Sequence, residues 1–120
     1  MSTISPIIPY RDLRPAIDFL CDAFGFERHA VHEDADGDLQ HVELRLGDDV
    51  VMPTGQGDPG HAMSYVVVSD ADAHHDRAKA AGAQITSELR DTDYGSRDYA
   101  ARDPEGNTWY FGTYRPLAPA

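Results

Sequence analysis

The sequence is poor in cysteine, in positive charge and in long hydrophobic runs. Cys21 is the single cysteine among 120 residues, which excludes an intrachain disulfide and a cysteine-rich zinc site. No apolar run approaches the roughly 20 residues that a membrane-spanning helix needs. The first residues, M-S-T-I-S-P, have neither the basic nor the apolar segment of a signal peptide. We therefore expect one cytoplasmic domain without a membrane segment.

Acidic residues outnumber lysine and arginine by 21 to 10, and the formal net charge is −11. A field of this sign repels phosphate backbones and anionic membrane surfaces, so binding to nucleic acid or to a membrane is not expected. Solubility is the simpler explanation of the charge, and attraction of a cationic ligand is the alternative.

Residues 94–114 are the stretch around which we expect the fold to be organised. Asp103-Pro104-Glu105-Gly106 has the residue types of a turn, so the stretch is predicted to be a β-hairpin. It holds four of the six tyrosines, the one tryptophan and one of the four phenylalanines. These rings could form the last wall of a ligand cavity or belong to an ordinary core, and the sequence leaves both open.

The rest of the chain repeats one order of elements. In the first half, Asp12 is a predicted helix N-cap and Gly25 a predicted C-cap, with an apolar stripe at helical spacing between them. Asp70 and Gly82 take these roles in the second half. Predicted strands cover residues 4–9, 26–33, 39–46, 50–53, 63–68 and 83–89, and residues 54–60 are loop-like.

This order predicts an α+β fold of two βαβββ modules that form a curved mixed sheet, with the helices on its outer face. Module 1 is expected at about residues 1–54, a loop at 54–61, module 2 at 62–114 and a tail at 115–120. Cys21 lies on the apolar helix stripe and is interpreted as a small buried hydrophobic residue. His74 and His75 are expected on an exposed helix surface.

Residues 39–46 alternate cleanly between apolar and polar side chains. Val42, Leu44 and Leu46 share one predicted face, and His41, Glu43 and Arg45 share the other. The pair His41–Glu43 is the best candidate for a metal or acid–base centre, and a solvent-exposed strand face is the alternative.

The chain resembles the vicinal oxygen chelate superfamily, which includes glyoxalase I, extradiol dioxygenases, fosfomycin-inactivating enzymes and bleomycin-binding proteins. The resemblance rests on Tyr10-Arg11-Asp12-Leu13 with Ile17-Asp18-Phe19 and Phe24-Gly25-Phe26, on residues 42–48 (V-E-L-R-L-G-D), and on Asp103-Pro104-Glu105-Gly106-Asn107. It implies the fold predicted above and a homodimer that builds its cavities across two chains.

Metal-using members of this superfamily hold an ion at four positions of the concave sheet face. The resemblance places these positions at about Ser5, Glu43, Ser64 and Tyr110. Neutral serine and tyrosine are poor ligands beside histidine or carboxylate. We therefore expect no metal and no cofactor.

Two functions follow from the resemblance. The first is a metal-free protein that binds a small molecule, an aromatic natural product or antibiotic, as bleomycin resistance proteins do. Its ligand-binding residues would be Glu43, His41, Arg45, Arg97, Tyr99, Tyr110 and Trp109, with Tyr110 favoured over Trp109 because alternation turns Trp109 toward the helices. The alternative is a glyoxalase-like lyase or isomerase that uses Glu43 as a base of raised pKa, with or without a divalent metal. A scaffold used only for dimerisation is a third possibility.

Overall fold

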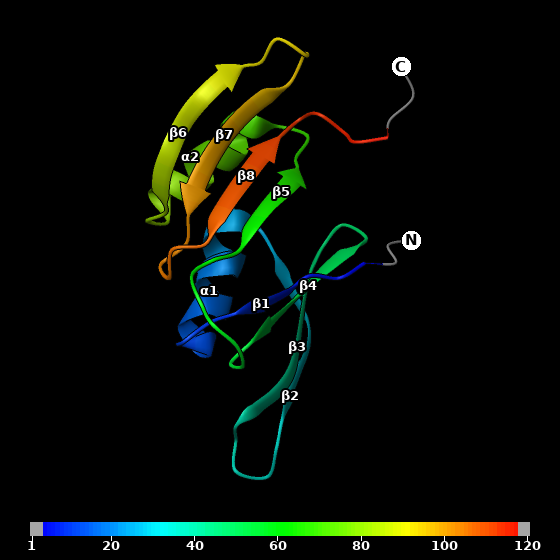
Figure 1. Ribbon diagram of the computed structural model, residues 1–120, viewed down its shortest axis with the longest axis vertical. Coiled ribbons are helices and arrows are strands. Elements are labelled where there is room, and N and C mark those ends of the chain that lie inside the picture. The colour runs from blue at the N-terminus through cyan, green and yellow to red at the C-terminus, as the bar shows by residue number, and fades with distance from the viewer. Residues whose placement is uncertain (1–3, 118–120) are drawn as a thin grey trace.

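The computed structural model describes residues 4–117 and contains two modules with the same order of elements (Figure 1). The first module has β1 (Ile7–Pro9), α1 (Leu13–Phe24), β2 (Glu27–Glu33), β3 (Leu39–Leu46) and β4 (Asp49–Thr54). The second has β5 (Met63–Val67), α2 (Ala71–Ala80), β6 (Gln84–Asp91), β7 (Arg97–Arg102) and β8 (Thr108–Gly112). The predicted fold of two βαβββ modules is confirmed. Residues 118–120 of the predicted tail lie outside the described residues.

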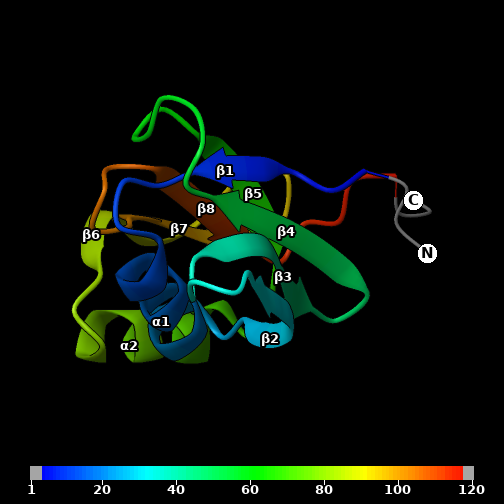
Figure 2. The same cartoon turned by 90° about the horizontal axis from the view of Figure 1, so that it is seen from below.

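The strands form two four-stranded sheets with equivalent orders, β1-β4-β3-β2 and β5-β8-β7-β6. In each sheet the first strand pairs in parallel with the last, and the other pairs are antiparallel. Both helices lie on the same side of the sheets and pack against each other (Figure 2). Among residues 4–117, neither helix has the length and apolar character needed to cross a membrane.

Helix α1 follows its predicted pattern. Ile17, Leu20, Cys21 and Phe24 are buried on the stripe that faces the sheets. Gly25 ends the helix with a φ of 84°, a left-handed conformation that glycine adopts without a Cβ clash, and its N–H bonds to the carbonyl of Leu20. Burial of Cys21 raises the pKa of its thiol, as expected of a core residue.

The start of α1 differs from the prediction. Asp12 occupies the N-cap position, but its side chain makes no capping hydrogen bond. The Glu105 carboxylate, on the turn between β7 and β8, instead accepts the backbone N–H groups of Arg11 at 2.5 Å and Asp12 at 2.8 Å. A carboxylate is favourable beside the positive end of a helix. The second module thereby holds the start of the first helix.

The buried carboxylate of Asp103 joins the modules at the same turn. Its Oδ2 accepts hydrogen bonds from the Tyr10 hydroxyl at 2.6 Å, the Asn107 amide at 3.1 Å and the Trp109 indole at 3.1 Å. Its Oδ1 accepts the backbone N–H groups of Glu105 at 3.0 Å and Asn107 at 3.1 Å. Burial and the neighbouring Asp103 charge raise the pKa of Tyr10 far above its ordinary value. The turn predicted from sequence is therefore also a contact between the two modules.

The common core is aromatic at its centre. Phe24 of α1 packs against Trp109 and Phe111 of β8, and Phe111 stacks on Tyr99 of β7 with ring centroids 5.1 Å apart. These β7 and β8 rings are buried. For Tyr99, Trp109 and Phe111, the structure therefore supports the core alternative left open above.

The expectation of exposed histidines on α2 is wrong. His75 is buried, and its ring lies between the Asp76 and Glu88 carboxylates. His74 Nε2 donates to the carbonyl of Phe24 at 2.8 Å, and Nδ1 accepts from the Tyr99 hydroxyl at 2.5 Å. Burial lowers the pKa of His74, so the neutral ring that makes both bonds is favoured. Sequence spacing could not reveal that α2 packs on α1.

Asp103→Asn is expected to lower the free energy of unfolding by about 3 kcal/mol, because an amide nitrogen cannot accept the hydrogen bonds that converge on Oδ2. Urea unfolding measures this change. Asp93→Asn at an exposed turn position is the matched control and should change stability by less than about 0.5 kcal/mol. Equal stability of the two variants would show that Asp103 does not hold the modules together.

Candidate functional site

Each sheet has one face toward the helices and one face away from them, which we term the open face. In the second sheet, strand register assigns the side chains to these faces, because directly paired residues point to the same side. Tyr65 on β5 pairs with Tyr110 on β8, and both are exposed on the open face. Ser64 pairs with buried Trp109 and therefore points toward the helices. On the open face, Tyr65 therefore stands where the resemblance placed a position at about Ser64, and Ser64 itself lines the cleft described below.

Four tyrosines lie at one end of this open face, and we call them the tyrosine cluster: Tyr65, Tyr94, Tyr110 and Tyr114. They are 40–62% exposed, whereas the remaining tyrosines, Tyr10 and Tyr99, are each 1% exposed. The rings of Tyr94 and Tyr114 meet edge to face with centroids 5.4 Å apart. The Tyr65 hydroxyl donates to the carbonyl of Tyr114 at 2.7 Å. Tyr65, Tyr94 and Tyr114 are therefore held by contacts with one another, and strand pairing places Tyr110 beside Tyr65.

The Asp98 carboxylate stands among these rings. The Ser96 hydroxyl donates to its Oδ1, and the Tyr94 hydroxyl donates to its Oδ2 at 3.1 Å. Asp98 pairs with Gly112, and a Cβ on Gly112 would lie 2.0 Å from Asp98 Oδ1 and 2.7 Å from the Tyr65 hydroxyl. Glycine is therefore required at position 112 for these two oxygens to approach the backbone together. Partial burial raises the pKa of Tyr65, and the nearby Asp98 charge adds to the rise.

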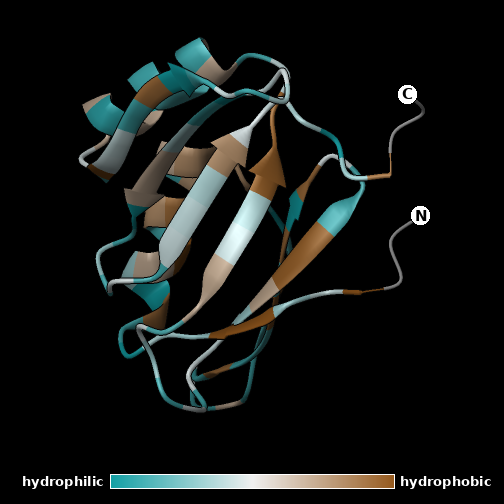
Figure 3. Ribbon diagram, turned by 45° about the horizontal axis from the view of Figure 1, so that its top comes forward, coloured by the Kyte–Doolittle hydropathy of each residue, from teal (hydrophilic) through white to brown (hydrophobic). Residues whose placement is uncertain are grey.

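A cleft of about 630 Å³ opens beside the tyrosine cluster, between the β3–β4 turn and β5. Its walls are mainly apolar and include Leu46, Val51, Val66 and Trp109, and Tyr65 lines it as well. Hydrophobic residues of β4 and β5 border this region (brown in Figure 3). Asp48 and Arg115 lie at the wall with opposite charges. A volume and lining of this kind suit a small organic molecule.

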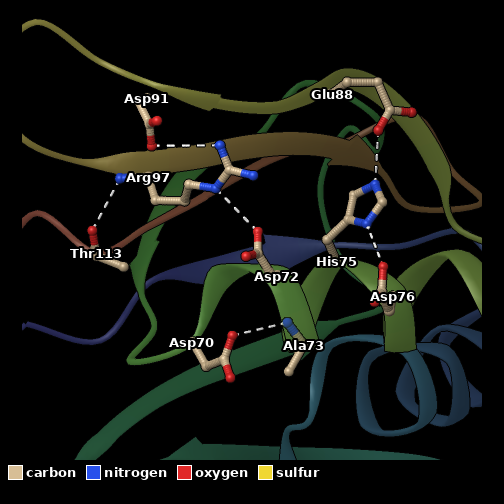
Figure 4. A network of polar contacts seen from close by, with 9 residues as sticks. All are labelled: Asp70, Asp72, Ala73, His75, Asp76, Glu88, Asp91, Arg97 and Thr113. Carbon is tan, nitrogen blue, oxygen red and sulfur yellow. Dashed lines mark hydrogen bonds and ion pairs between the residues drawn. The ribbon is translucent and has the colours of Figure 1, made fainter.

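Two predicted ligand residues point away from the open face. Arg97 binds Asp72 of α2 at 3.0 Å and Asp91 of β6 at 3.4 Å, so its guanidinium lies on the helix side of the sheet (Figure 4). These hydrogen bonds with carboxylates raise the pKa of Arg97. Tyr99 shares this side and is buried under α2. Trp109 is also buried, but it lines the cleft.

The predicted residues of β3 lie on the open face of the first sheet. His41 Nε2 lies 2.6 Å from Glu43 Oε2, and His29 Nε2 lies 4.0 Å from Glu43 Oε1. Arg45 is exposed on the same strand and donates to the carbonyl of Gly47 at 3.2 Å. The hydrogen bond with His41, supported by the charges of nearby histidines, lowers the pKa of Glu43. The raised pKa that the enzyme hypothesis required is not found.

The donors in the described residues do not fit a metal ion. Of the four positions that the resemblance marks, Glu43 alone carries a strong ligand. Within residues 4–117, no three His, Cys, Asp or Glu side chains are grouped so that they could hold one ion. His41 and Glu43 are brought together as predicted, and His29 lies 4.0 Å from Glu43, but these three side chains are not grouped to hold one ion.

The sequence reasoning missed Tyr65, Asp98 and the joint position of Tyr94 and Tyr114. Alternation in M-S-Y-V-V indicates that Tyr65 and Ser64 face opposite sides, but alternation cannot say which side is open. The sequence did contain one signal: Tyr94, Ser96 and Asp98 are two residues apart, a spacing that places side chains on the same face near the start of β7.

Comparison with known proteins identifies the family. The Glyoxalase/Bleomycin resistance protein/Dioxygenase superfamily model matches residues 3–111, and the chain belongs to this superfamily. The resemblance to vicinal oxygen chelate proteins is therefore confirmed. The uncharacterized protein Mb0911c of Mycobacterium bovis is 32% identical over an alignment of 124 positions, covering 91% of this chain and 81% of that protein.

Solved structures agree with the family assignment. TioX from Micromonospora sp. ML1 is 33% identical with a TM-score of 0.85, over 96% of this chain and 100% of that chain. TnmS3, an antibiotic binding protein from Streptomyces sp. CB03234, is 21% identical with a TM-score of 0.76, over 92% of this chain and 97% of that chain. The TnmS3 likeness is evidence for the fold alone.

His41→Ala is expected to raise the pKa of Glu43 toward the ordinary 4.5, because it removes the hydrogen bond that favours the carboxylate. Because the pKa of Glu43 is lower in the folded protein, its charged form stabilises the fold at neutral pH. This contribution is lost as the pH falls through the lowered pKa of the folded state. NMR titration of the Glu43 side-chain carboxyl measures the change. His61→Ala, in the exposed loop before β5, is the control, and an equal response to both substitutions would refute the pairing.

Proposed function

We propose that this chain is a small-molecule-binding protein whose ligand is an aromatic natural product or antibiotic. The observation that carries the proposal is the tyrosine cluster beside the apolar cleft. Exposed rings that take no part in the core offer flat faces for an aromatic ligand. Tyr65 belongs to both the cluster and the cleft, so one ligand can contact both.

Apolar surface beyond the cluster supports the same proposal. Ile7 of β1 and Met63 of β5 are 64% and 70% exposed. Apolar exposure on a sheet face is typical of a ligand or subunit contact. The family likeness adds support, since TnmS3 is an antibiotic binding protein of the same fold.

The predicted ligand set changes under this proposal. Tyr110 and Trp109 are kept, the first as an exposed ring and the second as a wall of the cleft. His41, Glu43 and Arg45 remain candidates on the open face of the first sheet. Tyr99 and Arg97 are left out, because both point toward α2. Tyr65 enters the set.

The homodimer implied by the superfamily is part of this proposal. The exposed Ile7 and Met63 are apolar side chains that a second copy would cover. A dimer would bring the open faces of two chains together, so that His41 and Glu43 of one chain could face the tyrosine cluster of the other. Cytoplasmic location stays a prediction.

The enzyme alternative has weaker support. Glu43 has a lowered pKa, and a general base for proton abstraction near neutral pH is stronger when its pKa is raised. The hydrogen bond to His41 is the observation in its favour.

Titration calorimetry with metal-free bleomycin, and in parallel with a panel of planar aromatic antibiotics, tests the proposal. We expect binding to the unmodified protein and a loss of about tenfold in affinity for Tyr110→Ala, which corresponds to about 1.4 kcal/mol. Tyr110→Phe keeps the ring and should keep the affinity.

Two results would contradict the proposal. One is the absence of binding across the whole panel. The other is binding that Tyr110→Ala and substitutions at Tyr65 leave unchanged, because the ligand would then lie elsewhere.

A further inference from the structure

Asp98 is a negative charge without a positive partner. Within residues 4–117, no Lys, Arg or His nitrogen comes within ion-pair distance of its carboxylate. Its hydrogen bonds come from the neutral hydroxyls of Ser96 and Tyr94. The neighbouring Arg97 points to the opposite side of the sheet, where it binds Asp72 and Asp91. The carboxylate therefore faces the open side uncompensated.

Aromatic rings surround this carboxylate. Tyr94 touches it directly, Tyr114 packs against Tyr94, and Tyr65 approaches it over Gly112. Tyr110 stands beside Tyr65 on the next strand. The face of a tyrosine ring attracts a cation, and a carboxylate at the same place adds direct charge attraction.

We propose that this arrangement is a subsite for a positively charged group of the ligand, an ammonium or amidinium, formed by Asp98, Tyr65, Tyr94, Tyr110 and Tyr114. This inference rests on the proposed function and specifies it, because it adds a cationic group to the aromatic ligand. The formal net charge of −11 favours the approach of such a ligand.

Local structure does not require the charge of Asp98. An asparagine at this position has the same size, its oxygen can accept from the Ser96 hydroxyl, and its amide can donate to the Tyr94 hydroxyl. Asp98→Asn therefore removes the charge and keeps the local hydrogen bonds. Asp93→Asn removes the same charge from an exposed position of the neighbouring turn, so it controls for the overall field.

The test compares choline with 3,3-dimethyl-1-butanol, its uncharged carbon analogue, on the full chain. Binding is followed by NMR through the ring resonances of the four tyrosines. We expect choline to bind about tenfold more tightly than the alcohol and to shift the Tyr94 and Tyr114 rings. Asp98→Asn should remove this preference, and Asp93→Asn should leave it within about twofold.

Equal affinity of the two probes for the unmodified protein would overturn the subsite, as would a preference that survives Asp98→Asn. The subsite would also be overturned if a second copy of the chain covered the four tyrosine rings, so that choline could not reach them. If aromatic antibiotics bind but choline has no advantage, only the charged subsite fails. If neither antibiotics nor choline bind, the proposed function fails with it.

Discussion

The buried Asp103 carboxylate is the interaction on which the relative position of the two modules depends. It lies in the turn between β7 and β8, yet it accepts a hydrogen bond from Tyr10, which follows β1. Glu105, two residues on, holds the backbone at the start of α1. A buried charge is stable only when its acceptor positions are filled, so this turn and the Tyr10–Asp12 segment must fold together. The cleft between the β3–β4 turn and β5 lies between the modules that this contact joins.

The C-terminal end of α1 is joined to α2 by a second set of contacts. His74 and Arg77 of α2 donate to carbonyl groups near the end of α1. These donors satisfy backbone groups that a helix leaves unpaired, and the Arg77 charge is favourable there. Both helices lie on the other side of the sheets, so within residues 4–117 neither helix covers the open faces. The tyrosines divide accordingly into a buried pair that builds the core and an exposed cluster to which we assign the proposed ligand.

Much of this fold follows from local sequence rules. The helix stripe that includes Ile17 and Phe24, the left-handed Gly25 and the alternation of residues 39–46 are short-range features, and all were predicted correctly. The residue types of Asp103-Pro104-Glu105-Gly106 identified the turn. Its contacts with Tyr10 and Arg11 could not be predicted, because more than 90 residues separate the partners.

The site was less predictable than the fold for the same reason. Arg97 and Tyr99 alternate with Asp98, and nothing local tells which set faces the helices. The resemblance gave one position only as about Ser64, whereas the register puts Tyr65 beside Tyr110, and a shift of one residue exchanges the two faces of a strand. Tyr65 and Asp98 meet only because β5, β8 and β7 are neighbours in the sheet, with Gly112 between them. The face on which each of these side chains lies can be assigned only from the register of the strands, and the structure supplies that register.

We infer that exposed tyrosines of the second sheet form a ligand surface, while two other tyrosines belong to the core. Nitration of native protein with tetranitromethane, mapped residue by residue by mass spectrometry, distinguishes the two groups. We expect modification of Tyr65, Tyr94, Tyr110 and Tyr114, reduced by a bound aromatic ligand, and none of Tyr10 or Tyr99, whose pKa values burial raises. Nitration of Tyr10 or Tyr99 in the folded protein, or a cluster that ligand does not protect, would contradict the account.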